Sequence, residues 1–226
     1  MASLSQLPQI VTAIGALGTA SFGVVDASKA LFFGGVNRIG FGAIKKTVTS
    51  LVPSAGNNAP SRDNVVATLK ANWFNGTDLG NQKSIAKSLI KLNLSPANAA
   101  VIAEVVGVDP AILQQAATDI AAGKSLVSPQ SDVYARFDVL VTALLDETYQ
   151  RSDNNYRNWT RTLAAVVAVL LAMIAGAALN QQGVVHVPVW QSAIVGLLAT
   201  PLAPIAKDVS TALATAVDTM QKVKKG

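Results

Sequence analysis

Few side chains in this sequence are of the kinds that catalyse reactions. The chain has no cysteine, which excludes thiol catalysis, disulfides and cysteine-built metal sites. Its one histidine, His186, has no acidic residue or second histidine near it in the sequence. That favours an interfacial histidine over a metal ligand or proton relay. No glycine loop followed by lysine, which would cradle a phosphate, is present. We therefore expect a non-enzymatic protein with no catalytic residues, no metal site and no cofactor.

The charged residues recur at helical spacing. Two acid–base pairs stand four residues apart, Glu147 with Arg151 and Asp153 with Arg157. Such pairs stabilise an exposed helix. A row of lysines with the same spacing is interpreted as a solvated helix face and not as a phosphate site: Lys83, Lys87 and Lys91.

Nucleic acid is not expected as a partner, although the net charge is +5. Helices expected at 82–92 and 96–106 are spaced like a helix-turn-helix, but the second has no arginine, lysine or glutamine to read base edges. The positive charge is interpreted instead as lysine and arginine on the cytoplasmic side of a membrane.

The composition and one long apolar run indicate a membrane protein. Of the residues, 50% are hydrophobic and 14% charged, where soluble domains carry about 25% charged residues. The run from Thr162 to Leu179 has no charged residue. At ~1.5 Å per residue, about 20 such residues cross the hydrocarbon layer of a bilayer. This run predicts a transmembrane helix that continues a long helix starting near Pro129.

Two further apolar segments predict two more crossings. The first, from Leu7 to Val25, carries a stripe of small residues that would let another helix approach closely: Thr12, Ala16, Ala20 and Gly23. The alternative for this run is a buried helix of a soluble domain. The other segment, Val184 to Ala206, would complete a hairpin with the long helix and end near Pro201 and Pro204.

The segment between the first crossing and the middle of the chain mixes aromatic, glycine and basic residues. Glycines at 34, 35, 40 and 42 are expected to break regular helix, and Arg38, Lys45 and Lys46 to lie at headgroups. The alternative is a plain glycine-rich connector. After a linker at 51–61, capping residues and prolines predict helices at 62–73, 82–92, 96–106 and 110–122.

Aromatic and basic residues are expected to gather at one face of the bilayer, near its anionic headgroups. They are Arg38, Lys45, Lys46, Tyr149, Arg151, Tyr156, Arg157, Trp159, Arg161 and Lys207. The first nine residues and the 180–190 turn have no lysine or arginine. The positive-inside rule then places the N-terminus outside, and the middle domain and C-terminus in the cytoplasm.

The tail after Lys207 has apolar residues at alternating spacings of four and three, a coiled-coil-like seam of Val209, Leu213, Ala216, Met220 and Val223. The predicted fold is thus an all-α integral membrane protein with about three transmembrane helices and a small helical cytoplasmic domain. Its expected segments are 1–34 (first membrane helix), 35–61 (interfacial segment and linker), 62–128 (cytoplasmic domain), 129–206 (long helix and hairpin) and 207–226 (basic amphipathic tail).

The block from Asp146 to Asn180 resembles a widespread, poorly characterised family of bacterial inner-membrane proteins. The similar residues are Asp146-Glu147-Thr148, Arg151, Tyr156-Arg157 and Ala178-Leu179-Asn180, with Gly196-Leu197-Leu198-Ala199-Thr200 further on. The chain departs from the family at Asn158, where a basic residue is usual, and at Gln181 and Gln182, where an aspartate is common. The resemblance implies a cytoplasmic helical region, a C-terminal transmembrane hairpin and a bacterial source, but no activity.

Packing surfaces without catalytic groups favour a scaffold, anchor or assembly subunit, working as a homo-oligomer or within a membrane complex. The alternative is an oligomeric pore or channel-like effector, lined by Thr12, Thr19 and Ser21. No aspartate, glutamate, lysine or arginine lies within the apolar runs of the expected crossings. This makes a pore the less favoured hypothesis, because intramembrane charges usually mark ion pathways.

Overall fold

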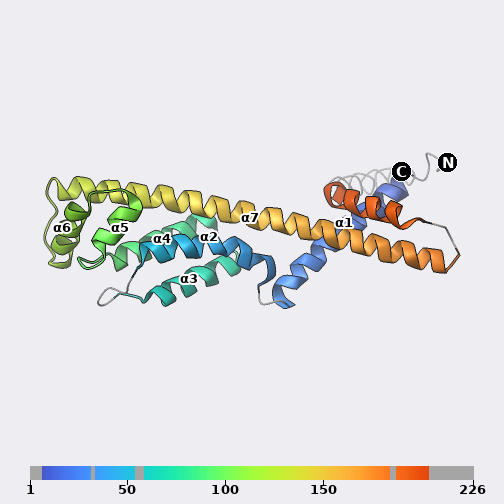
Figure 1. Cartoon of the computed structure of the whole chain (residues 1–226), viewed down its shortest axis with the longest axis horizontal. Helices are drawn as coiled ribbons and strands as arrows, with labels where there is room; N and C mark the ends of the chain where they lie inside the picture. Colours follow the sequence, from blue (N-terminus) through green and yellow to red (C-terminus); the bar gives the residue numbers. More distant parts are fainter. Residues whose placement is uncertain (1–6, 32–33, 54–58, 184–186, 204–226) are drawn as a thin grey trace, which may run out of the picture. The chain divides into compact units, whose positions relative to one another are not determined.

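The computed structural model describes residues 7–31, 34–53, 59–183 and 187–203, which form helices and no strand (Figure 1). The helices are α1 (Leu7–Leu31), α2 (Gly35–Leu51), α3 (Arg62–Phe74), α4 (Leu79–Asn93), α5 (Ala99–Val106), α6 (Pro110–Ala121) and α7 (Gln130–Gln181). A further apolar helix spans Val189–Ala203. The expected all-α class is therefore confirmed.

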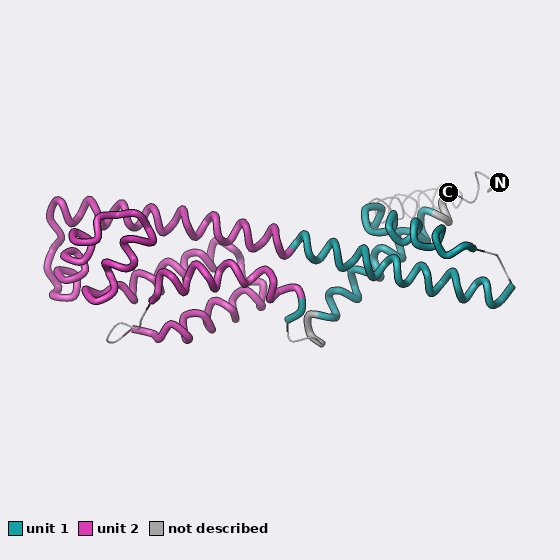
Figure 2. The backbone as a smooth tube through the Cα atoms, in the orientation of Figure 1, with its two compact units in different colours: residues 1–35, 157–226 teal, residues 36–156 magenta. Residues whose placement is uncertain are grey.

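The chain divides into two compact units (Figure 2). Unit 2 is the continuous stretch Val36–Tyr156, whereas unit 1 combines Met1–Gly35 with Arg157–Gly226. Helix α7 contributes its first part to unit 2 and its second part to unit 1. These limits differ from the expected segments, because α2 and the first part of α7 share one core with α3–α6.

Unit 2 is built around one buried apolar core. Apolar residues spaced by three or four bury one face of each long helix, since burial of such side chains is the main stabilising term in water. The buried residues include Ile44, Val48 and Leu51 of α2, Val65, Leu69 and Trp73 of α3, Ile90 of α4, Ile102 of α5, Leu113 of α6, and Phe137, Val141 and Leu145 of α7.

Side-chain caps fix the helix starts in unit 2. Ser61, Asp78 and Asp109 each accept a hydrogen bond from the backbone amide three residues on. Gly107 and Gly123 have positive φ at helix ends, as expected of C-terminal stops. Asp78 was not predicted as a cap. Because it caps the helix, α4 begins at Leu79 and not at the predicted residue 82.

Helix α5 begins at Ala99 and not at the predicted residue 96. The Asn98 side chain accepts from the Ser95 amide (2.8 Å) and donates to the Asn93 carbonyl (2.7 Å). These two bonds hold 95–98 as a turn, because side chains of this type compete with helical backbone bonding.

The prediction that glycines break the helix after residue 31 was wrong for α2, which is continuous from Gly35 to Leu51. Gly40 is buried, and a Cβ on it would lie 2.6 Å from Cζ2 of Trp73 and 3.2 Å from the Ser152 carbonyl oxygen. The Trp73 indole also donates to the Asn37 carbonyl (3.0 Å). The glycine therefore permits close packing of α2 on α3 and α7.

This arrangement predicts opposite effects for two neighbouring alanine substitutions in α2. Gly40→Ala should lower the free energy of unfolding by about 1–3 kcal/mol, because the methyl group overlaps its neighbours. Gly42→Ala should raise it by about 0.5–1 kcal/mol, because its Cβ meets no atom within 4 Å and alanine favours helix. Urea unfolding of both variants measures the two changes in the free energy of unfolding. Equal changes would contradict the close packing at Gly40.

Unit 1 brings α1, the second part of α7 and the Val189–Ala203 helix together at glycines. A Cβ on Gly18 would overlap the carbonyl oxygen of Ala199, and a Cβ on Gly176 would overlap Oγ of Ser192. A Cβ on Gly196 would lie 2.5 Å from the Cα of Val169. Backbones this close need residues without side chains at the crossing points.

Candidate functional site

Unit 1 carries its large apolar side chains on the outside. Val166, Leu170 and Ile174 of α7 are 51%, 53% and 65% exposed, while Ala164, Ala168 and Ala172 beside them are buried. The Val189–Ala203 helix repeats the pattern, with Trp190, Ile194, Leu197 and Leu198 exposed and Ser192, Ala199 and Ala203 buried. Among its described residues, unit 1 thus buries mostly small side chains and exposes many large apolar ones, whereas the core of unit 2 contains large apolar side chains.

Two helices among the described residues are long and apolar enough to cross a membrane. They are α1, through Val11–Ser28, and α7. The Val189–Ala203 helix is apolar but shorter.

The small-residue stripe predicted on α1 does not make the contacts within unit 1. Thr12, Ala16, Ala20 and Gly23 are all exposed. The buried face of α1 is formed instead by Gly15, Gly18, Ser21 and Val25. The predicted stripe is therefore exposed in the part of unit 1 that the structure describes.

Tyr149 does not lie at a membrane interface, where the sequence placed it. It is 1% exposed in the core of unit 2, and its hydroxyl donates to the Gln82 carbonyl oxygen (3.5 Å). Burial raises the pKa of its phenol above the ordinary range. Tyr156 is half-buried and packs edge-on against Trp73, with ring centroids 6.2 Å apart.

The other predicted interface residues that the structure describes are exposed: Arg38, Lys45, Lys46, Arg151, Arg157, Trp159 and Arg161. Arg151 is paired with Glu147, as expected from their spacing. His186, Lys207 and the seam from Val209 to Val223 lie outside the described residues.

The lysine row on α4 is paired and not simply solvated, which corrects the sequence interpretation. Lys83 binds Asp146 (2.5 Å), while Lys87 (2.6 Å) and Lys91 (2.9 Å) both bind Asp138. Hydrogen bonds from Lys87 and then Lys91 lower the pKa of Asp138, and the bond with Asp138 raises the pKa of Lys91. The row therefore ties α4 to α7.

Asp138→Asn should lower the free energy of unfolding by about 1–2 kcal/mol at neutral pH, because two ion pairs are lost and two lysines four residues apart then repel. Since the folded-state pKa of Asp138 lies below its ordinary 3.8, the wild-type advantage should be present above about pH 4 and disappear as pH falls through that lowered pKa. Urea unfolding across this range tests it. Asp119→Asn is the control, because its pair with Lys124 is 4.0 Å long and the Lys124 side chain is 71% exposed; an equal loss there would contradict the prediction.

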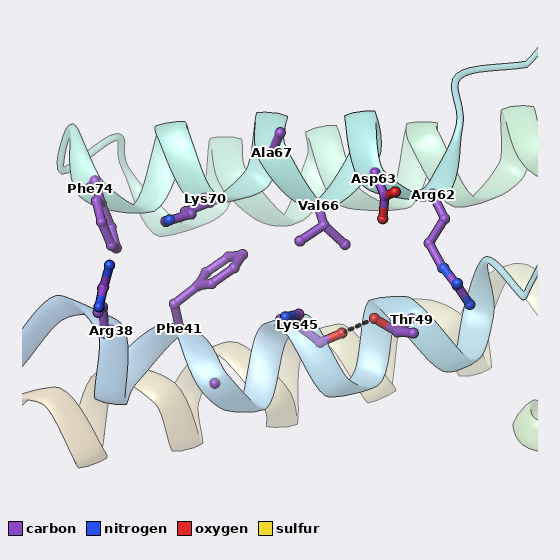
Figure 3. Close-up of a pocket in the computed structure, with 11 residues that line it drawn as sticks. Arg38, Phe41, Lys45, Thr49, Arg62, Asp63, Val66, Ala67, Lys70 and Phe74 are labelled. Carbon is purple, nitrogen blue, oxygen red and sulfur yellow. Dashed lines mark hydrogen bonds between the residues drawn. The ribbon is translucent and has the colours of Figure 1, made fainter. Parts of the chain in front are cut away.

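A basic groove of about 670 Å³ lies between α2 and α3 (Figure 3). Four cations line it, Arg38 and Lys45 from α2 and Arg62 and Lys70 from α3, against one carboxylate, Asp63. Its apolar lining is Phe41, Val66, Ala67 and Phe74. Lys70 lies over the Phe74 ring (Nζ 5.3 Å from the centroid), and Arg62 donates to the Pro53 carbonyl (3.4 Å).

Sequence reasoning found half of this groove. It named Arg38 and Lys45 but assigned them to headgroups, and it did not single out Arg62 and Lys70. The available signal was the row Val66, Lys70 and Phe74, spaced by four along α3.

Among the described residues, no three His, Asp or Glu side chains lie close enough to hold a metal ion. Comparison of the chain with protein-family models, with curated proteins and with solved structures finds no match.

Proposed function

We propose that unit 1 crosses a bilayer and that the protein is a non-enzymatic scaffold or anchor, with unit 2 as its soluble domain. The observation that carries this proposal is that unit 1 exposes large apolar side chains and buries small ones. In water, an apolar surface of that kind is unfavourable by about 25 cal/mol per Å², and large exposed patches are rare on soluble proteins. In lipid it is the expected exterior, because helices there associate by close contact of small residues.

The burial of the two long apolar helices supports the same proposal. Only 22% of each candidate span is buried inside the chain, whereas the core helix of a soluble domain is mostly buried. Unit 2 shows the soluble pattern in the same chain, with Phe137, Ile44 and Leu51 fully buried. This contrast supports the proposal that the membrane segment lies in unit 1.

The basic residues give the proposed orientation. Arg38 follows α1, and Arg157 and Arg161 precede the apolar part of α7, whereas the turn at 180–190 has no lysine or arginine. The positive-inside rule then puts unit 2 in the cytoplasm and the turn outside, in a bacterial inner membrane.

The absence of cysteine makes a direct test possible. Single-cysteine variants at Leu170 and Ile174 should resist a membrane-impermeant maleimide in intact cells and in inverted vesicles, and react after denaturation. Gln182→Cys should react in intact cells, and Lys124→Cys only in inverted vesicles. The membrane proposal fails if Leu170→Cys and Ile174→Cys react as fast as Lys124→Cys in vesicles, or if the protein is found in the soluble fraction.

The scaffold role predicts association through the open stripe on α1. Ala16→Leu should reduce the oligomer mass in detergent, measured by light scattering, because a bulky side chain separates helices that meet at small residues. Val24→Leu is the control, since Val24 is 48% exposed and lies outside the stripe. A monomeric wild type, or an unchanged mass for Ala16→Leu, would count against association there; unitary currents in liposomes would support the pore instead.

A further inference from the structure

The four cations of the α2–α3 groove have no ion-pair partner among the described residues. This sets them apart from the lysine row on α4, where each lysine binds a carboxylate of α7. The one acid in the groove, Asp63, leaves a lining charge of 4 − 1 = +3. These cations are therefore available to an anionic molecule that binds in the groove.

The spread of these cations sets the size of that molecule. Arg38 and Lys45 are seven residues apart on α2, and Arg62 and Lys70 are eight apart on α3, which is about 10–12 Å along each helix. A small anion or one headgroup reaches one end of such a row. An occupant that neutralises both rows must extend along the groove for about two turns of helix or more.

The floor of the groove sets the character of the occupant. The lining between the cations is apolar: Val66 and Phe74 are half-buried and Phe41 is buried (Figure 3). An amphipathic helix with an apolar ridge and acidic flanks matches this apolar lining and its basic edges. We propose that the groove binds an acidic amphipathic helix of a partner protein.

The chain itself is a poor source of that helix. Its residues 207–226 contain four lysines and two aspartates, 4 − 2 = +2, and a second copy of the chain carries +5. Neither carries the excess of negative charge that would complement the groove. This partner helix would give unit 2 a binding role within the proposed scaffold. Its binding does not require that unit 1 lies in a bilayer.

The test uses the full-length protein in non-ionic detergent and a fluorescent synthetic helix of about fifteen residues, with leucine along one face and glutamate on both flanks. A control peptide has glutamine in place of each glutamate, and empty micelles serve as the blank. Fluorescence anisotropy should show that the glutamate peptide binds at least about tenfold more tightly than the control, and that its binding weakens with salt.

Matched double variants locate the binding. Lys45→Gln with Lys70→Gln should weaken binding of the glutamate peptide by about tenfold, because two charge pairs are lost. Lys46→Gln with Lys124→Gln removes the same charge outside the groove and should change it less than about twofold. Equal effects of the two double variants, or equal binding of the two peptides, would overturn the proposal. It would also be overturned if anionic phospholipid vesicles bound in a Lys45- and Lys70-dependent way while the peptide did not. The maleimide test of unit 1 is unaffected by either result.

Discussion

Gly18→Leu is expected to prevent α1 from packing in unit 1. The first added carbon would already overlap the Ala199 carbonyl oxygen and lie 2.8 Å from Cβ of Ala203. Leucine adds three further carbons where backbone leaves no room, and overpacking of this kind destabilises by about 3 kcal/mol or more. Titration of the purified protein from mild detergent into SDS, followed by circular dichroism, should show an earlier unfolding transition.

Val24→Leu on the same helix is the control. Val24 is 48% exposed and lies outside the stripe of small residues. Its transition should stay near the wild-type midpoint, since one exposed apolar side chain replaces another. If Gly18→Leu unfolded at the same SDS concentration as Val24→Leu, the close approach of α1 to the Val189–Ala203 helix would be refuted.

Phe137→Ala is the second large effect, and it concerns unit 2. Phe137 is fully buried in the core of unit 2, with its ring 5.9 Å from that of Tyr134. Removing a buried phenylalanine ring costs about 3–5 kcal/mol, because the apolar contacts are lost and a cavity remains. A domain with ordinary marginal stability loses much of its free energy of unfolding by that change.

Trp73 is the reporter for this measurement, because it is buried in unit 2 while Trp159 and Trp190 belong to unit 1. In a background with phenylalanine at those two positions, urea unfolding followed by tryptophan fluorescence reports on unit 2. Val139→Ala is the control, since Val139 is 65% exposed on the same helix and should change stability by less than about 0.5 kcal/mol. Similar losses for both variants would show that the Phe137 side chain is not in a packed core.

Local chemistry in the sequence was sufficient for most of the helices in unit 2. Asp109 followed by Pro110 predicted the start of α6, and the structure has Asp109 capping the amide of Ile112 (2.9 Å). Such signals lie within one turn of the helix, so they need no knowledge of tertiary contacts. Gly107 and Gly123 predicted helix ends for the same reason.

The errors concern residues whose role depends on a distant partner. Tyr149 stands near arginines and before an apolar run, a pattern typical of a membrane interface as well as of a core. Its burial follows from the fold, which brings Gln82 of α4 against it. Likewise, Gly40 was interpreted as a helix breaker because Trp73, which fills the space beside it, lies in another helix.

The candidate groove was beyond sequence reasoning for a related reason. Its two basic rows lie on α2 and α3, and the charge excess arises only when those helices face each other. The lysine row on α4 has the opposite outcome, because its charges are neutralised by another helix. The spacing of the lysines correctly predicted a helix, but the carboxylates that pair with them, Asp138 and Asp146, belong to α7, about fifty to sixty residues later in the chain.

The discontinuity of unit 1 has a consequence for biosynthesis. Helix α1 leaves the ribosome before all of unit 2, which is 156 − 36 + 1 = 121 residues long, and before the helices it packs against. At translation rates of about 5–20 residues per second, α1 waits for many seconds with its glycine face unoccupied. Unit 2 can complete its core as soon as Tyr156 has left the ribosome, so the nascent chain can contain a folded helical domain before its first helix meets its partners.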